Sequence, residues 1–515
     1  MRTTYIAAAL ILAFASPVTA TYNYIAGYEP GSDVDDHNMI DLDVRDIQAG
    51  LPDNNGGVLK ACGDNLCNWD KTADMYPALW STTCTHNDNT PSSTAECQTP
   101  YAIWLKGKNS LKKSSVRSIG DGFAGAIGKK RSKHSDTGVA FGTSASNTPF
   151  ISTMNSYWQS KGLDGESWGK DIIEAAFKGT TIPGSSFNFG SVGMDFRKEV
   201  IQKGIVYLNV FPYVIWEMQD AINDCIDGQL GANDATPGGN SVHAWDEAVA
   251  FYTGSAEGKN KGGNNGLKSC SDGKCYLQFM LADKRCKNFG TCTADNDGDA
   301  FSGYSKANNE IFALFQQGER EIVQAATSTS ATKCALPLIT MEKVTTKMLV
   351  PYIQGVMRYL YKTKDQGGRS AKQVGELFAF ASAALPFINA VDPTAATMLY
   401  KRAWDLDFDT YTYEETKKAI EATYPKLGHG EGIGTITCAD IGHLYDSGPT
   451  LIAEGCYDPV PSKDEEDNSL AIALGVTFGV LALIAIAFAI WAAKKERKTR
   501  LMYENILRPD KVPAV

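Results

Sequence analysis

The sequence predicts a mainly α-helical protein of two related helical-bundle units, a bilobal arrangement. A disulfide-stapled, loop-rich N-terminal cap and a single C-terminal transmembrane helix complete the prediction. Three observations support this class. Apolar residues recur at helical spacing from residue 150 onward, twelve cysteines lie between Cys62 and Cys456, and apolar stretches lie near both ends of the chain. The spacing indicates helices, and an even cysteine count in a secreted chain indicates disulfides.

Residues 1–20 have the pattern of a secretory signal peptide. Arg2 precedes an apolar core at 5–14, and small residues at 18–20 form a cleavage site. This core is too short to span a bilayer, which argues against an N-terminal membrane anchor. We expect the mature chain to begin near Thr21.

Residues 469–493 form a second apolar stretch, which contains no charge and is long enough to cross the roughly 30 Å hydrocarbon core of a bilayer. An acidic stalk at 459–468 precedes it, and a basic cluster opens the tail at 494–515. The positive-inside rule therefore predicts a single-pass plasma-membrane protein with an extracellular N-terminal ectodomain. A GPI signal is disfavoured because polar residues follow the apolar stretch.

The predicted cytoplasmic tail contains Tyr503 and Ile506 in the order Tyr-x-x-Ile. This pattern resembles the Y-x-x-Φ endocytic sorting signal, in which Φ is a bulky apolar residue. Four-residue patterns also occur by chance, so the position close to the membrane carries the interpretation. It predicts an endocytic adaptor as a partner and endosomal vesicles as a second location.

The ectodomain is acidic. The chain has 49 Lys and Arg and 59 Asp and Glu, of which 41 basic and 56 acidic residues lie in 21–468, giving that segment a net charge of −15. Such a surface argues against nucleic acid as a partner and suits a cationic ligand. The sequence contains no nucleophile elbow, no Ser-His-Asp order and no dinucleotide fingerprint, so it predicts a binding protein and not an enzyme.

The N-terminal cap at 21–149 is rich in turn-forming residues in its first part and holds four cysteines. This composition predicts loops stapled by disulfides. His37 stands within an acidic cluster at 35–43. The cluster could bind a cation, but an exposed acidic loop is the favoured interpretation.

The first helical unit is predicted at 150–305, with helices at 151–159, 168–177 and 196–226 and a kink at Pro212. One face of the third helix aligns a phenol with carboxylates: Tyr213, Glu217, Asp220 and Asp224. Oxygen donors of this kind suit hard cations such as ferric iron. The alternative is that these side chains form a polar stripe exposed to solvent. The sequence does not favour cation binding over this alternative.

A further short helix is predicted at 241–254, after a loop. Ser241 is the expected N-cap and Gly254 the expected stop. The remainder of the first unit, at 254–305, is rich in Gly, Asn, Lys and Cys. We expect it to be a loop insertion.

Three side chains on the helix at 241–254 share one face. His243, Asp246 and Glu247 lie about one turn apart, because residues three and four apart are neighbours on a helix. One imidazole and two carboxylates in this arrangement can hold a cation. On residue types alone, an amphipathic helix with a solvated acidic face is favoured.

The second helical unit is predicted at 306–458, with helices at 308–326, 341–364, 370–390 and 393–406. Asp392 should cap the last of these, and a capping box at 412–415 should begin another helix. A weak internal repeat relates 246–251 to 375–380. The second copy lacks His243 and Asp246, so we expect a single cation site.

Three segments carry a family resemblance: HAWDEAVAFYTG at 243–254, Lys284-Arg285-Cys286 with Asn288-Phe289-Gly290-Thr291-Cys292, and Ala307-Asn308-Asn309-Glu310-Ile311. They resemble the algal iron-assimilating, low-iron-inducible periplasmic proteins and their membrane-anchored relatives, the phytotransferrins. The helical core is also similar to imelysin-like proteins. The resemblance covers roughly residues 150–460.

The phytotransferrin resemblance implies a cell-surface protein that captures Fe³⁺ with carbonate as a synergistic anion. It further implies endocytosis and release of iron on acidification, with a ferric reductase or permease downstream. Combined with the residue patterns, it predicts metal ligands among His243, Asp246, Glu247, Tyr213, Glu217 and Asp220. Carbonate needs a positive holder, and charge within helical segments points to Arg358, Arg369 and Arg402.

Three alternatives stay open. An imelysin-like hydrolase would use His243 and Glu247 around a divalent metal. An adhesion or signalling receptor would bind no metal through its ectodomain. An assembly factor would co-purify with a multispan reductase or permease.

Overall fold

The structure is a computed structural model, and its described residues, all between 25 and 456, belong to one compact unit. It describes residues 25–51, 100–107, 118–120, 150–226, 228, 241–255, 276–293, 300–301, 304–326, 328, 333–427, 435–446 and 448–456. The predicted signal peptide at 1–20, the segments predicted at 459–515, and the sorting residues Tyr503 and Ile506 lie outside the described residues.

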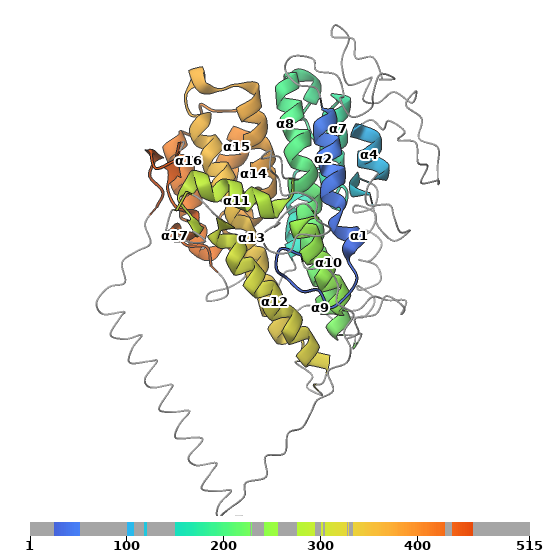
Figure 1. Cartoon of the computed structure of the whole chain (residues 1–515). Helices are drawn as coiled ribbons and strands as arrows, with labels where there is room; N and C mark the ends of the chain where they lie inside the picture. Colours follow the sequence, from blue (N-terminus) through green and yellow to red (C-terminus); the bar gives the residue numbers. More distant parts are fainter. Residues whose placement is uncertain are drawn as a thin grey trace, which may run out of the picture. The chain divides into compact units, whose positions relative to one another are not determined.

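Helices make up most of the described chain (Figure 1), which confirms the mainly α-helical prediction. In chain order they are α1 (Asp35–Asn38), α2 (Ile40–Gly50), α4 (Pro100–Lys106), α6 (Phe150–Ser160), α7 (Trp168–Lys178), α8 (Met194–Ile205), α9 (Phe211–Ile226), α10 (Ser241–Thr253), α11 (Gln278–Phe289), α12 (Lys306–Ala326), α13 (Ala335–Lys362), α14 (Ala371–Val391), α15 (Pro393–Ala403), α16 (Tyr413–Glu421) and α17 (Cys438–Ile441). Single 3₁₀ turns occur at η3 (Phe189–Ser191), η7 (Gln366–Gly368) and η8 (Tyr424–Lys426).

Two short antiparallel strand pairs accompany the helices. β1 (Cys292–Thr293) pairs with β2 (Tyr304–Ser305), and Cys292 stands opposite Ser305. β3 (Leu444–Tyr445) pairs with β4 (Leu451–Ala453), and Leu444 stands opposite Ala453. These strand pairs join short loop segments through hydrogen bonds. Most of the hydrophobic core consists of residues from the helices.

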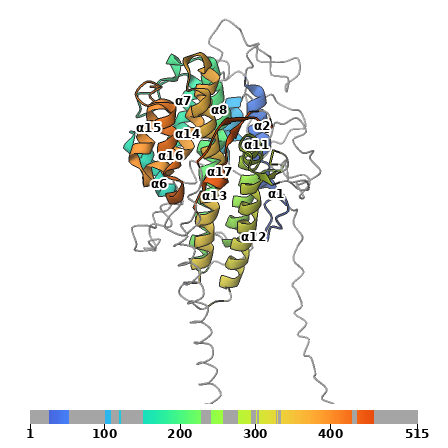
Figure 2. The ribbon, with the colours of Figure 1, turned by 90° about the vertical axis from the view of Figure 1, so that its left-hand side faces the viewer.

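The predicted bilobal arrangement is not confirmed. Helix α8, from the first predicted unit, packs along α14 from the second, and α9 contacts α13. Apolar residues of both predicted units, such as Val200 and Leu377, belong to one hydrophobic core. Helices α12 and α13 also run side by side in both views (Figures 1 and 2). Apolar helix faces leave water by packing on one another, and here the two predicted units use each other as partners.

The run predicted at 196–226 is a continuous helix with a π-helical turn. Helix α8 leads into η4 (Val206–Val210) and then into α9, whose second residue is Pro212. Proline has no amide hydrogen to donate to the preceding turn, so a wider turn just before it accommodates the break. The side-chain amide of Asn209 donates to the Gly204 carbonyl at 3.2 Å, which supplies a partner beside the altered ladder.

Helix α10 packs along α9. Gly254 ends α10 as predicted, with a φ of 82°, and its N–H donates to the Ala250 carbonyl at 2.9 Å. Ser241 does not act as the predicted N-cap. It is the first residue of α10, and its hydroxyl donates to the Ala221 carbonyl of α9 at 2.6 Å. This bond fixes the start of α10 against its neighbour.

The acidic segment around His37 is helical and buried, which corrects the prediction of an exposed loop. It forms α1 and the start of α2, and α1 packs against α10. Asp41 and Asp43 are both 0 % exposed. The Ser255 hydroxyl donates to Asp41 at 2.8 Å, because a buried carboxylate needs hydrogen-bond donors. Apolar residues at helical spacing, Ile40, Val44 and Ile47, bury this segment.

The prediction of a loop at 254–305 is wrong for part of that segment. Helix α11 lies within it, and Phe279, Cys286 and Phe289 are buried on its inner face. These residues recur at helical spacing, but polar residues between them hide the pattern in the composition. The Cys286–Cys292 disulfide joins the end of this helix to β1.

The predicted caps at Asp392 and Thr412 are found, and the cysteines of the described residues are paired as predicted. The Asp392 side chain accepts from the N–H groups of Thr394 and Ala395, and Thr412 and Glu415 form a capping box. The described cysteines form three disulfides: Cys225–Cys334, Cys286–Cys292 and Cys438–Cys456. The other predicted pairs lie outside the described residues.

Among the described helices, α14 alone is long and apolar enough to cross a membrane. Within its most apolar window 83 % of the residues are buried inside the protein, so α14 is a core helix here. The spanning segment predicted at 469–493 lies outside the described residues.

Candidate metal centre

Two imidazoles and one carboxylate converge between α1 and α10. Helix α10 presents His243 and Glu247 on one face because they lie four residues apart, and α1 brings His37 against that face. Oε1 of Glu247 lies 3.0 Å from Nε2 of His243 and 3.1 Å from Nε2 of His37. Among the described residues, these three form the one group of His, Cys, Asp or Glu whose ligand atoms could hold a metal ion.

The spacing of these atoms suits a metal ion. Ligands at right angles on an ion with bonds of about 2.1 Å stand about 3 Å apart, close to the observed separations from Glu247 to His37 and His243. A carboxylate oxygen facing two ring nitrogens is stable when both nitrogens carry protons or when a cation stands among the three atoms. The second arrangement lets both nitrogens and the oxygen donate electron pairs to one ion.

The centre is largely shielded from solvent. The side chains of His37, His243 and Glu247 are 10 %, 14 % and 15 % exposed. The ring of Phe251 meets the His37 ring edge-on, with centroids 5.7 Å apart. Burial by itself would raise the pKa of Glu247, but attraction to His37 and hydrogen bonds from both imidazoles hold that pKa well below its usual value. Glu247 therefore keeps its negative charge.

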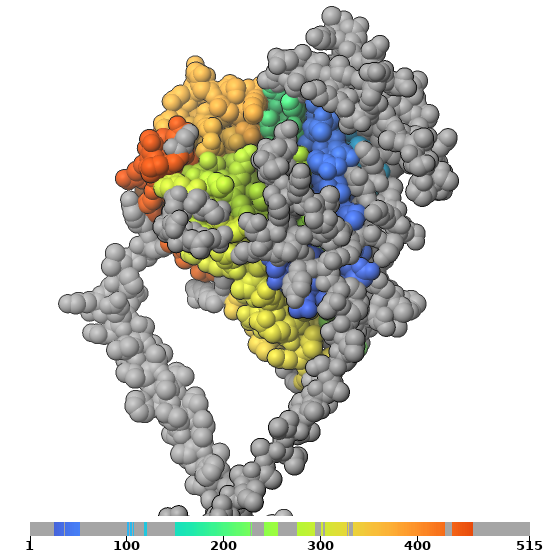
Figure 3. Space-filling model, viewed as in Figure 1, coloured from blue at the N-terminus to red at the C-terminus, as the bar shows by residue number. Residues whose placement is uncertain are grey.

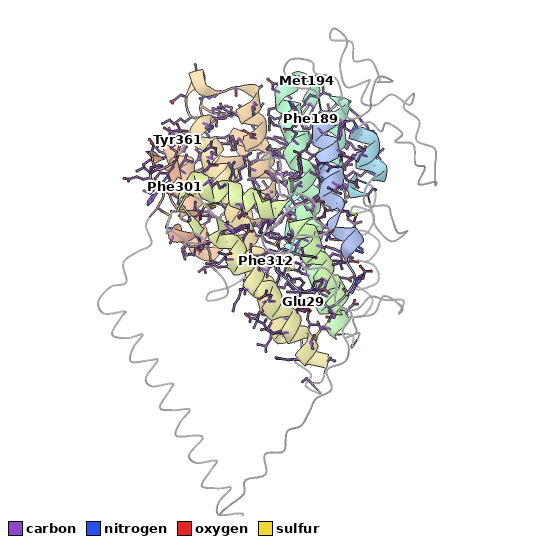
Figure 4. All side chains as sticks on the ribbon, viewed as in Figure 1. Glu29, Phe189, Met194, Phe301, Phe312 and Tyr361 are labelled. Atoms are coloured by element: carbon purple, nitrogen blue, oxygen red, sulfur yellow. A yellow bond between two sulfur atoms is a disulfide. The ribbon has the colours of Figure 1, made fainter. Side chains whose placement is uncertain are left out.

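Asp246 belongs to a layer behind the three converging side chains. Its carboxylate accepts hydrogen bonds from the Tyr28 hydroxyl and, at 2.7 Å, from the Ser32 hydroxyl. The Ser32 oxygen lies 3.0 Å from Nδ1 of His243. Because Ser32 gives its hydrogen to Asp246, it accepts from Nδ1–H of His243. Nε2 then donates to Glu247 while it carries a proton, and it offers its electron pair to a metal once that proton is lost. Figure 4 labels Glu29, which belongs to the same N-terminal stretch as Tyr28 and Ser32.

The two adjacent carboxylates of α10 differ in charge. Burial, reinforced by repulsion from Glu319 on α12, raises the pKa of Asp246 to about 8. Burial also raises the pKa of Glu319 to about 7. Asp246 therefore takes up a proton far more readily than Glu247. Of the two predicted carboxylate ligands, Glu247 has the charge and the position to meet a cation.

The oxygen donors predicted on α9 do not belong to the converging group of His37, His243 and Glu247. Tyr213, Glu217 and Asp220 are buried, with exposures of 1 %, 1 % and 5 %. The Tyr213 ring meets Phe251 edge-on at 5.2 Å, and Phe251 in turn contacts His37. Tyr213 thus supports the wall of the centre through an aromatic contact.

The three predicted anion holders lie on other helices. Arg369 donates to the Thr363 and Lys364 carbonyls, and Arg402 donates to the Phe408 and Tyr411 carbonyls. These contacts give both guanidinium groups a structural role. Arg358 lies on α13 near Arg285, and burial together with repulsion from Arg285 lowers its pKa. None of the three contacts His37, His243 or Glu247 in the described part of the chain.

One candidate ligand and two supporting residues were not among the site residues predicted from the sequence. His37 stood within a recognised acidic cluster, and the cation interpretation of that cluster was the less favoured one. Tyr28 and Ser32 carry no local signal, because their role depends on contact with Asp246 far along the chain. The apolar period of α2, which predicts a buried segment, was the available sign that His37 is not on an exposed loop.

Comparison with known families concerns the segment that contains α10. Residues 93–296 match the family model Fea1, described as low iron-inducible periplasmic protein. This segment is similar to the low iron-inducible periplasmic family. No curated protein and no solved structure gives a significant match. The likeness to imelysin-like proteins receives no support from these comparisons.

The matched segment includes two members of the candidate metal centre. His243 and Glu247 lie inside residues 93–296, and His37 lies before them. The match starts earlier and ends earlier than the resemblance at 150–460. Helices α12 to α16, which complete the core, lie beyond it.

Proposed function

We propose that this protein captures ferric iron at the cell surface, with His37, His243 and Glu247 as its protein ligands. The observation that carries the proposal is the convergence of two imidazole nitrogens on one ionised carboxylate oxygen. Two imidazoles and one carboxylate are a donor set used by non-haem iron, and they leave coordination positions open. The family description, with its low-iron induction, favours iron over other metals that accept these donors.

Carbonate is proposed as the ligand of the ion that does not come from the protein. The protein supplies two nitrogens and one carboxylate, whereas ferric iron favours anionic oxygen donors. Carbonate offers such oxygens and fits open positions on the metal. The printed contacts of Arg369 and Arg402 are to backbone carbonyls elsewhere in the fold, so in this proposal the ion itself supplies the positive charge that holds the carbonate.

A ferric titration of purified full-length protein in detergent tests this function. We expect bicarbonate to tighten ferric binding at pH 7.5 at least tenfold, and acidification to pH 5.5 to release the metal. Imidazole must lose its proton before it can bind a metal, so affinity falls as pH falls. No tyrosinate-to-iron absorbance band is expected, because no phenol belongs to the converging group. Absence of ferric binding with and without bicarbonate would refute the proposal and favour a metal-free receptor.

Delivery by endocytosis is the proposed second half of the function. It rests on the tail pattern of Tyr503 and Ile506 and on the predicted single-pass plasma-membrane topology. Surface-labelled full-length protein should enter vesicles, and Tyr503→Ala should hold it at the surface. Lys511→Ala, a change in the same tail, is the matched control. Equal internalisation of the Tyr503 variant and the natural protein would exclude this signal.

A further inference from the structure

A cavity of about 400 Å³ opens between α2, α8, α11 and α14, away from the residues of the metal centre. Helices α2 and α11 reach the same face of the molecule in Figure 3. Its lining contains four cationic side chains, Lys198, Lys203, Lys284 and Arg285, and one carboxylate, Glu376. This volume falls within the range of cavities that bind small organic ligands.

Arg285 is the decisive residue of this cavity. It is only 4 % exposed, and its Nε and Nη1 atoms have no hydrogen-bond partner among the described residues. Its guanidinium carbon lies 5.8 Å from the centre of the Phe380 ring, which supports the group from one side. A buried guanidinium with unused donors is costly unless it meets an anion or water. The planar donor pair of arginine suits carboxylate and phosphate oxygens.

The acidic groups nearby are already engaged. Lys203 lies 3.4 Å from Glu199 and 3.9 Å from Glu376. Lys372 lies 3.8 Å from Glu199. Lys198, Lys284 and Arg285 have no carboxylate partner within ion-pair distance in the described residues. The cavity therefore keeps an excess of positive charge within an acidic protein.

The electrostatics of Lys284 agree with this excess. Lys284 lines the cavity but is exposed at its surface. Partial loss of hydration, with repulsion from Lys203 and Arg285, lowers the pKa of Lys284 to about 8, although Glu376 and Glu199 oppose the shift. Arg358, which is near enough to Arg285 for repulsion between them to lower its pKa, has Nε and Nη1 atoms without a hydrogen-bond partner among the described residues as well. An anion in the cavity would relieve the repulsion among these cations.

We propose that this cavity binds a small polyanion with two or more carboxylate or phosphate groups, held chiefly by Arg285 and Lys284. The cavity is larger than one carbonate or phosphate ion needs, and cations line it from α8 and α11. A ligand with two separated anionic groups contacts both sides. Tyr207 and Tyr359, on the wall, are placed to contact its uncharged part.

Calorimetric titration of metal-free, full-length protein with citrate, pyrophosphate and inorganic phosphate tests the proposal. We expect saturable binding of citrate or pyrophosphate, at least tenfold tighter than that of phosphate; the two polyanions separate a carboxylate from a phosphate preference. Arg285→Gln should weaken binding at least 30-fold and Lys284→Gln about tenfold. Lys401→Gln, which removes an exposed lysine of α15, should leave it unchanged. Because no metal is present, the result does not depend on the metal centre.

The pH dependence gives a second measurement. Lys284 loses its charge as pH rises through about 8, whereas citrate stays ionised, so citrate affinity should fall between pH 7 and 9.5. Lys284→Gln should flatten this dependence, and it tests the proposal even if Arg285→Gln does not fold. Absence of polyanion binding, equal affinity for phosphate, or binding that neither variant weakens would overturn the proposal.

Discussion

Replacing Glu247 by alanine is expected to weaken ferric binding by the full-length protein at least about 100-fold. Glu247 supplies the oxygen that both imidazole nitrogens face, and its lowered pKa keeps it ionised. Changes to groups that only orient metal ligands already cost about 10–100-fold in affinity. Loss of the anionic ligand itself should cost more. Competition calorimetry against a ferric chelator of known affinity measures the change.

Two further variants serve as comparisons for the effect of Glu247→Ala on ferric binding. Glu414→Ala removes an exposed carboxylate of α16 and should keep the affinity within about twofold. Asp246→Asn keeps the size of the side chain and should cost about tenfold, because Ser32 would orient His243 less firmly. If Glu247→Ala bound iron as tightly as the natural protein, with an unchanged melting temperature, Glu247 would not be a ligand.

His37 distinguishes the observed centre from the ligand set predicted on α9. His37→Ala should weaken ferric binding about as much as Glu247→Ala, since both remove an atom from the same group. Tyr213→Phe should leave it unchanged, because the Tyr213 ring contacts Phe251 through its aromatic face and edge. If Tyr213→Phe weakened ferric binding and His37→Ala did not, the metal ligands would instead be Tyr213, Glu217 and Asp220.

Loss of the Cys225–Cys334 disulfide is expected to produce the largest loss of stability from any single cross-link in the described residues. The two cysteines are separated by 109 positions and join the end of α9 to the start of α13. Closing a loop of about 100 residues stabilises a protein by about 4.7 kcal/mol in the chain-entropy account. Domains have about 5–15 kcal/mol in total, so the Cys225→Ala, Cys334→Ala variant should be close to unfolding.

The Cys438–Cys456 disulfide provides the matched control for this prediction. Its cysteines are 18 positions apart, so removing both should cost about 3 kcal/mol. Guanidinium unfolding of both double variants, followed by tryptophan fluorescence, measures the difference. Equal costs for the two disulfides would show that loop length does not govern their contribution.

Much of the secondary structure could be predicted because its causes are local. The cap at Asp392, the capping box at Thr412 and the stop at Gly254 each involve residues within a few positions of one another. Helix α11 and the first helices were missed for a compositional reason, since Gly, Asn, Asp and Lys surround short apolar periods. The apolar residues at helical spacing form a helix when a neighbouring apolar surface is available for them to pack on.

The two-unit arrangement that the internal repeat predicts is not confirmed, for a related reason. Similar helical patterns at 246–251 and 375–380 indicate similar helices, but they do not say which helices pack together. Helices of both predicted units bury their apolar faces in one core, and α8 packs on α14. The choice of partner depends on complementary surfaces, which a period along the chain does not encode.

The sequence alone determined that His243 and Glu247 share a helix face, because a spacing of four is one turn. Only the tertiary structure decided that α1 brings His37 to that face, that Asp246 turns toward Tyr28 and Ser32, and that Arg285 is buried in a cavity. The physical reason is the same in each case. A helical period fixes neighbours three or four residues apart, whereas contacts between distant segments arise from the packing of buried faces.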